Sequence, residues 1–80
     1  VLAAFLAECC VVSQTAKAAA RELYQAYVAW CEQNGERPNS QRAFGMRLTE
    51  RGFERYRANG FWWRGVGVRN EWNQRNQFSV

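Results

Sequence analysis

A short helix that runs directly into a β-hairpin is the feature that most constrains this chain. The dipeptide Asn59-Gly60 lies between two runs rich in aromatic and β-branched residues. This is the strongest short-range cue for a hairpin, because both central residues of a type I′ turn need a positive φ angle. Residues 53–68 are therefore predicted to form two antiparallel strands. Residues 40–52 are predicted to form the helix before them, with Ser40 as its N-cap.

Two further helices are predicted upstream. Apolar residues recur at helical spacing at the start of the chain, namely at Leu2, Phe5, Leu6 and Cys9. A second apolar stripe consists of Leu23, Tyr27, Trp30 and Cys31, and the helix that carries it is predicted to end at Asn34-Gly35. Between these helices, residues 12–15 interrupt the pattern with β-branched and hydroxyl side chains. The Ala-rich stretch that follows either starts a helix at once or first makes a short strand.

The predicted helix at residues 40–52 has an apolar side and a polar side. Phe44 and Leu48 share one face by the helical period and must point at the core. The opposite side consists of Arg42, Met46 and Thr49. Gly45 flanks this outward side, where it costs about 1 kcal/mol against Ala. We interpret it as the small residue that lets the helix approach a groove closely.

Eighty residues are enough for one domain. So small a chain needs a core dense in large side chains, and its four Trp, three Tyr and five Phe can supply that volume. The order of parts predicts an α+β fold, a small winged helix-turn-helix in which three helices are followed by a β-hairpin wing. Residues 1–68 are expected to form this winged-helix domain. Residues 69–80, which are rich in Asn and Gln, are expected to form a flexible polar tail.

The net charge of +4 is concentrated in the helix and the hairpin. Residues 41–64 carry six Arg against two Glu, a net of +4, whereas residues 1–40 carry three basic residues against four Glu, a net of −1. Positive charge on one face is typical of a phosphate-binding surface. Ten of the eleven basic residues are Arg, whose planar fork suits phosphate and guanine. A solvated basic face is the alternative. We expect the six guanidinium groups to converge on one side of the fold.

The composition argues against catalysis and against a metal or cofactor site. The chain has no His and no Asp, so a Ser or Cys nucleophile lacks its usual base. Cys9, Cys10 and Cys31 lack the spacing of metal ligands, and their odd number favours buried thiols in a reducing compartment. We therefore expect that this chain alone is not an enzyme and binds no cofactor. The apolar run at residues 1–12 is too short to span a bilayer, so no membrane partner is expected.

Several stretches resemble a known family of replication proteins. They are the run Leu23-Tyr-x-x-Tyr-x-x-Trp-Cys31, the pair Phe44-Gly45, the triplet Arg51-Gly-Phe53 and the strand Trp63 to Val68. Together they resemble the C-terminal winged-helix domain of phage- and plasmid-type primase–helicases, the superfamily-three replication proteins of prophages and satellite phages. This resemblance implies a parent protein with primase and hexameric ATPase parts, located in the cytoplasm of a bacterial host. It also implies that the module binds origin or duplex DNA.

The resemblance makes residues 40–52 the recognition helix and residues 55–64 the wing. The predicted DNA-binding residues are Ser40, Gln41, Arg42, Arg47, Thr49, Arg55, Arg57, Asn59 and Arg64. Gln41, Arg42 and Thr49 are expected to approach base edges. Arg47 and the wing arginines are expected to contact phosphate or the minor groove, with Asn59 at the tip. If about five phosphates are neutralised, log K falls against log salt with a slope near −4 to −5.

A protein-interaction module is the alternative interpretation. Phe61, together with Trp62 or Trp63, makes the hairpin more apolar than phosphate contact requires. In this case the same surface docks another replication protein or a neighbouring subunit of a parent hexamer. Salt separates the two alternatives, because DNA binding collapses as salt rises whereas an apolar interface persists.

Overall fold

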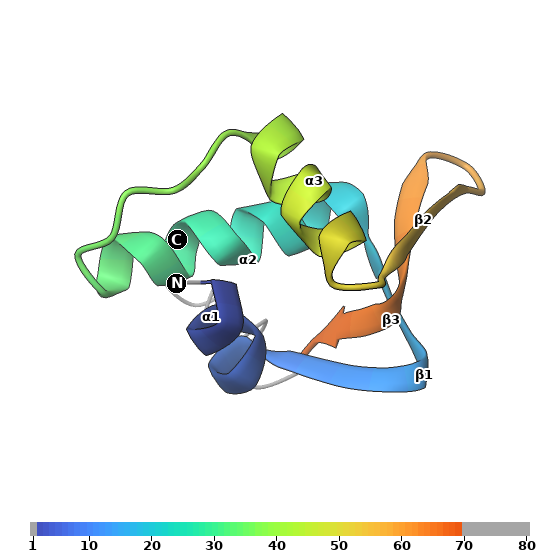
Figure 1. Ribbon diagram of the computed structural model, residues 1–80, viewed down its shortest axis with the longest axis horizontal. Helices are drawn as coiled ribbons and strands as arrows, with labels where there is room; N and C mark the ends of the chain where they lie inside the picture. The colour runs from blue at the N-terminus through green and yellow to red at the C-terminus, as the bar shows by residue number, and fades with distance from the viewer. Residues whose placement is uncertain (1, 70–80) are drawn as a thin grey trace.

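The computed structural model describes residues 2–69, and it contains three helices and a three-stranded sheet. In chain order the elements are α1 (Leu2–Cys9), β1 (Cys10–Ala19), α2 (Ala20–Gln33), α3 (Gln41–Glu50), β2 (Glu54–Arg57) and β3 (Phe61–Val68). The three helices lie together on one side, and the sheet, with its projecting β2–β3 hairpin, lies on the other (Figure 1). No helix within the described residues is long and apolar enough to cross a membrane.

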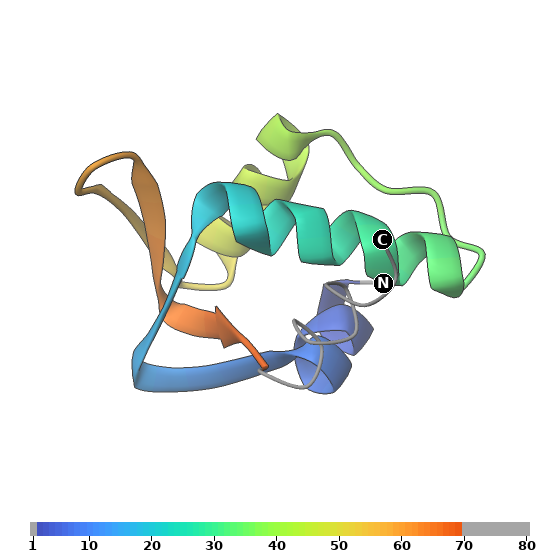
Figure 2. The ribbon, with the colours of Figure 1, turned by 180° about the vertical axis from the view of Figure 1, so that it is seen from behind.

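β3 is the middle strand of the sheet and pairs antiparallel with both β1 and β2. β1 bends between Val12 and Lys17, where its register against β3 shifts. Gly65, which has a φ of 96°, lies opposite this bend, a backbone conformation that glycine adopts without strain. The first half of β1 therefore pairs with the end of β3. The second half pairs with the earlier part of β3, which is also the second strand of the hairpin (Figure 2).

An aromatic cluster joins the three helices. The rings of Tyr27 in α2 and Phe44 in α3 stack with their centroids 4.5 Å apart, and Phe5 of α1 meets Tyr27 edge-on at 5.5 Å. Such pairs stabilise a core by about 0.5–1.5 kcal/mol beyond the area that they bury. The sheet contributes Trp63 and Val66, both buried. The apolar faces predicted for the three helices are confirmed as buried, except that Leu2 of α1 is only half-buried.

The predicted winged helix-turn-helix is wrong. The prediction placed three helices before a hairpin wing, but a ten-residue strand, β1, separates α1 from α2. The hairpin is consequently part of a three-stranded antiparallel sheet, and the fold is a small α+β domain with a different order of elements. The physical reason lies at residues 11–15, where β-branched and hydroxyl side chains favour an extended backbone, and β3 offers a partner for this segment.

The end of the described chain is bonded to the junction of α1 and β1. The backbone N–H of Arg69 donates to the carbonyl of Cys9 at 2.9 Å, and its Nε donates to the carbonyl of Cys10 at 3.2 Å. The rest of the predicted tail, residues 70–80, lies outside the described residues. The predicted boundary between domain and tail therefore stays a prediction.

Candidate nucleic-acid interface

α3 is held in place by its cap, its core face and the loop before it. The Oγ of Ser40 accepts a hydrogen bond from the backbone N–H of Ala43 at 3.2 Å, as expected of an N-cap. The preceding residue, Asn39, is clamped to α2, because its N–H donates to Tyr27 Oη at 3.1 Å and its carbonyl accepts from Tyr24 Oη at 2.9 Å. These contacts fix where α3 begins.

Gly45 sets the side of α3 that faces the sheet. A Cβ at this position would lie 3.5 Å from Cζ2 of Trp63, so Gly45 points at β3 and not at solvent. Our interpretation of Gly45 as a residue for close approach to a groove is therefore wrong. Gln41 and Thr49 lie one helical turn before and after Gly45, and Arg42 lies three residues before it. These polar side chains thus run along the hairpin side of α3, and all three are exposed.

The hairpin turns one face toward α3, and we call it the inner face. It carries Trp63, with Arg55 paired directly opposite, and Phe61, with Arg57 paired opposite. Side chains opposite each other in an antiparallel pair share a face. The guanidinium carbons of Arg55 and Arg57 lie 4.9 Å and 5.8 Å from the centroid of the Phe61 ring, which is 50% exposed.

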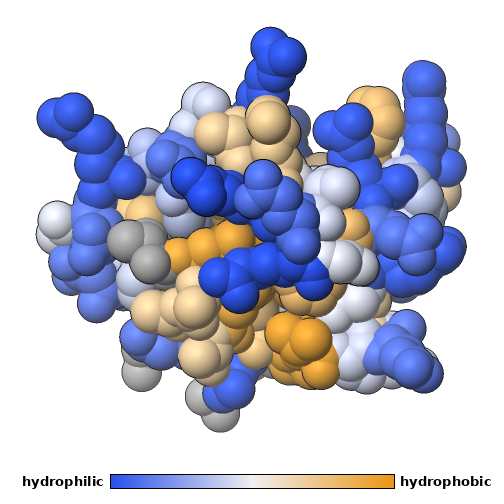
Figure 3. All heavy atoms as spheres, in the orientation of Figure 1, coloured by the Kyte–Doolittle hydropathy of each residue, from blue (hydrophilic) through white to orange (hydrophobic). Residues whose placement is uncertain are grey.

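We call the hairpin side of α3 together with the inner face of the hairpin the α3–hairpin surface. Its polar members are Gln41, Arg42, Thr49, Arg55 and Arg57, and its apolar members are Met46 and Phe61. In the orientation of Figure 1, hydrophilic residues gather over α3 and the hairpin, and hydrophobic residues gather below them, over α1 and the start of β1 (Figure 3). This surface is the largest gathering of predicted DNA-binding residues in the described part of the chain.

The opposite face of the hairpin, the outer face, carries a second group of basic and aromatic residues. Lys17, Arg64 and Glu54 form one row across the three strands, and Tyr56 and Trp62 belong to the next row. Lys17 Nζ lies 5.5 Å from the Trp62 ring centroid, and the guanidinium carbon of Arg64 lies 4.6 Å from that of Tyr56. Arg64 is therefore on the side of the sheet away from Arg55 and Arg57.

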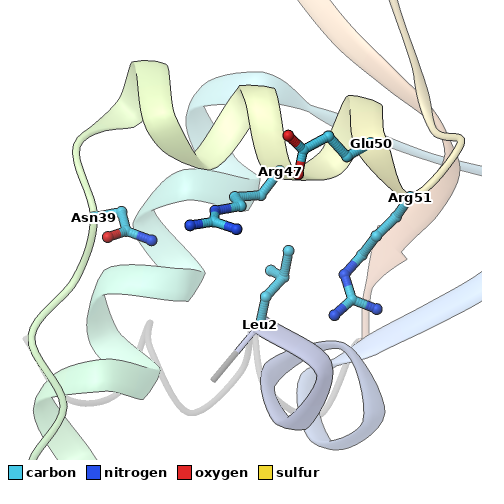
Figure 4. A pocket seen from close by; sticks show the side chains of 5 residues that line it. All are labelled: Leu2, Asn39, Arg47, Glu50 and Arg51. Carbon is cyan, nitrogen blue, oxygen red and sulfur yellow. The ribbon is translucent and has the colours of Figure 1, made fainter.

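Arg47 lies on the side of α3 away from the hairpin. It lines a hollow of about 470 Å³ between α3 and α1, together with Leu2, Asn39, Glu50 and Arg51. Figure 4 shows Leu2 pointing up from α1 between the two arginines, whose guanidinium groups reach from α3 toward α1 and the loop that holds Asn39. The hollow mixes two cations with a carboxylate and an apolar floor.

The expectation that six guanidinium groups converge on one side is wrong. Arg42, Arg55 and Arg57 lie on the α3–hairpin surface, Arg47 and Arg51 lie at the hollow beside α1, and Arg64 lies on the outer face. The physical cause is periodicity, because neighbouring strand residues alternate between faces and a helix spreads its residues around its axis. None of these arginines makes an ion pair within residues 2–69, so their charges are not neutralised there by carboxylates.

The hairpin tip differs in one detail from the predicted two-residue turn. Asn59 and Gly60 both have positive φ angles, 57° and 107°, as the sequence predicts. However, Arg57 pairs with Phe61, so the loop has three residues and begins at Ala58. Asn59 is exposed at the tip. The indole Nε1 of Trp62 donates to the Ala58 carbonyl at 2.9 Å and fixes that ring against the loop.

Sequence reasoning missed two members of these surfaces, Lys17 and Tyr56. Both lie on the outer face, and Lys17 reaches it only because β1 pairs with β3. Its alternation with the buried Ala18 is the signal that could have placed it on a strand.

Two buried thiols, those of Cys10 and Cys31, remain protonated near neutral pH. Burial raises the pKa of the Cys10 thiol to about 12 and also raises the pKa of Cys31. Within residues 2–69 no group of three or more His, Cys, Asp or Glu side chains could hold a metal ion.

Comparison with known proteins places the chain in a family. The family model described as Poxvirus D5 protein-like matches residues 1–77, and the chain therefore belongs to this family. The match links the chain to viral replication proteins of the primase–helicase-like kind, which confirms the resemblance at this level but not the assignment to their C-terminal winged-helix domain. No curated protein and no solved structure matches significantly.

Proposed function

We propose that this member of the poxvirus D5 protein-like family is the module through which a phage-type replication primase–helicase binds duplex or origin DNA. The observation that carries the proposal is the α3–hairpin surface, where Arg42 belongs to an exposed polar stripe of α3 and Arg55 and Arg57 of the hairpin lie beside that stripe. None of the three is neutralised by a carboxylate within the described residues.

The helix and the hairpin are assigned different roles in this contact. The stripe of Gln41, Arg42 and Thr49 has the side chains that read base edges, because Arg pairs with guanine and Gln pairs with adenine. Arg55 and Arg57 on the inner face of the hairpin bind phosphates and set the register, with Asn59 at the tip. Ser40 is assigned to capping α3 because its Oγ already accepts the Ala43 N–H.

The arrangement supports weaker binding than the sequence alone predicts. Three cations on one surface give a slope of log K against log salt of about −2.7, instead of the −4 to −5 expected for five phosphates. Arg47 and Arg64 are not expected to contribute to this salt slope because they lie on other sides of the fold. A dissociation constant of about 10⁻⁴ to 10⁻⁶ M is typical of nonspecific binding. Several copies in a hexameric parent would raise the effective affinity.

A duplex titration at several salt concentrations tests the proposal. Fluorescence anisotropy of a labelled duplex is measured for the wild type, for Arg42→Ala and for Arg57→Ala, and each variant is expected to reduce the salt slope by about 1. Arg47→Ala is the matched control, because it removes the same charge from the opposite side of the same helix. Equal losses from Arg42→Ala and Arg47→Ala, or no loss from either, would contradict the proposed surface.

Protein docking is the second candidate, and exposed apolar side chains on the same surface favour it. Met46 is 59% exposed and Phe61 is 50% exposed. On this account the surface binds another replication protein or a neighbouring subunit, and its affinity persists at high salt. Phe61→Ala then weakens the complex more than Arg42→Ala does, which is the opposite of the order expected for DNA.

A further inference from the structure

We infer that the outer face of the hairpin is a second nucleic-acid surface, one that binds single-stranded DNA by base stacking. The inference goes beyond duplex binding and does not rest on it, because it concerns the other face of the sheet. It is carried by four side chains that lie in two rows across the three strands, namely Lys17, Tyr56, Trp62 and Arg64.

The outer face alternates cations and rings. Arg64 lies over Tyr56 with its guanidinium carbon 4.6 Å from the ring centroid, and Lys17 Nζ lies 5.5 Å from the Trp62 ring centroid. None of the four residues is buried: Lys17 and Arg64 are exposed, and Tyr56 and Trp62 are half-buried. The two cations are therefore accessible in the described part of the chain, and each partly covers an aromatic plane, so a base reaches this face by stacking on the guanidinium plane of Arg64 or by displacing the ammonium of Lys17 from Trp62.

These side chains are also held in place. Trp62 donates from its indole Nε1 to the Ala58 carbonyl at 2.9 Å, which fixes the ring plane. Tyr56 and Trp62 are a directly paired couple on adjacent strands, so the β-sheet sets their spacing. A preformed surface loses less conformational entropy when it binds a ligand than a flexible one does.

Single-stranded DNA fits this chemistry better than duplex DNA. Unpaired bases stack on aromatic rings and on guanidinium planes, whereas a duplex buries its base faces in its own stack. Lys17 and Arg64 lie one row from the rings and can neutralise the phosphates that join such bases. Among protein partners, only an acidic one would be attracted to two cations in these positions.

One residue on the outer face works against DNA. The carboxylate of Glu54 lies on the strand position directly opposite Arg64 and repels phosphate. Glu54→Gln removes this charge with little change of shape and is therefore expected to tighten single-strand binding. A variant that gains affinity cannot be explained by a loss of folding.

Intrinsic tryptophan fluorescence with an oligothymidylate of about ten nucleotides tests the inference. Stacked bases are expected to quench Trp62, and Trp62→Leu and Arg64→Ala are expected to weaken binding about 5- to 150-fold. Trp62→Phe keeps a ring and retains most of the affinity. Arg42→Ala, on the other surface, leaves single-strand affinity unchanged, and circular dichroism verifies that every variant is folded.

The outcomes separate this inference from the proposed duplex function. Loss of single-strand binding in Arg64→Ala with unchanged duplex binding supports two surfaces. If the outer-face variants bind the oligonucleotide as the wild type does, or if Glu54→Gln fails to tighten binding, the inference is overturned. Duplex binding that depends on Arg42 would still stand in that case. Oligonucleotide binding that depends on Arg42 alone would also overturn it.

Discussion

Replacing Gly45 with Ala is expected to stabilise the domain without affecting DNA binding. Gly45 lies within α3, where glycine costs about 0.8–1.0 kcal/mol relative to Ala. The added Cβ would lie 3.5 Å from Cζ2 of Trp63, an ordinary van der Waals contact that needs no rearrangement. The free energy of unfolding should therefore rise by about 0.5–1 kcal/mol, or roughly 2–8 °C in Tm for a domain of this size.

Urea and thermal denaturation followed by circular dichroism measure this change. Gly67→Ala is the matched control, because its Cβ would lie 3.1 Å from the backbone carbonyl oxygen of Lys17, so the neighbouring strand must move. That variant is expected to be destabilised. A destabilised Gly45→Ala would contradict the packing of α3 on Trp63. A stable Gly45→Ala that no longer binds duplex DNA would show that Gly45 faces the DNA after all.

Three further predictions concern stability. Ser40→Ala removes the N-cap of α3 and should lower the free energy of unfolding by about 1 kcal/mol in urea denaturation. Tyr27→Phe leaves the N–H of Asn39 without its acceptor and should cost about 1–3 kcal/mol by the same assay, more than Tyr24→Phe, whose hydrogen bond is exposed. The Cys10 thiol has a pKa raised from 9.0 to about 12, so the unfolded chain loses this proton first. Stability should therefore be full below about pH 9 and fall as pH rises toward 12, a fall that Cys10→Ala reduces.

Each of these predictions can fail in a recognisable way. A Ser40→Ala domain as stable as the wild type would mean that α3 needs no cap. Equal costs for Tyr27→Phe and Tyr24→Phe would contradict the clamp on Asn39. A stability profile that stays flat above about pH 9 would mean that Cys10 is not shielded from water in the fold.

The helices and the hairpin could be predicted from local sequence because their signals are local. The apolar stripe of α2, the buried pair Phe44 and Leu48 and the positive φ angles at Asn59 and Gly60 all follow from spacing or turn chemistry. These features depend on residues a few positions apart, where periodicity is informative.

β1 could not be predicted with certainty because its partner is far away in sequence. Cys10 pairs with Val68, so the strand depends on a contact that local pattern does not encode. Without β1, the hairpin was predicted to be an isolated wing, and Lys17 could not be assigned to its outer face. The stability of a strand depends strongly on its neighbours in the sheet.

The distribution of the arginines was mispredicted for a geometric reason. Counting charges along residues 41–64 treats them as one cluster, but alternation along β3 and β2 and rotation around α3 send them to three sides. Arg64 and Arg55 lie near each other in the sheet and still face opposite directions, because Arg64 pairs with Glu54, and Arg55 is the next residue along that strand.

The most direct test of the account follows the arginine side chains themselves by NMR. With ¹⁵N-labelled protein and a short duplex at low salt, the Nε resonances of Arg42, Arg55 and Arg57 are expected to shift on titration. Those of Arg47 and Arg64, on the other two sides of the fold, are expected to stay in place. Equal shifts at all five, or shifts confined to Arg47 and Arg64, would contradict the α3–hairpin surface as the duplex-binding site.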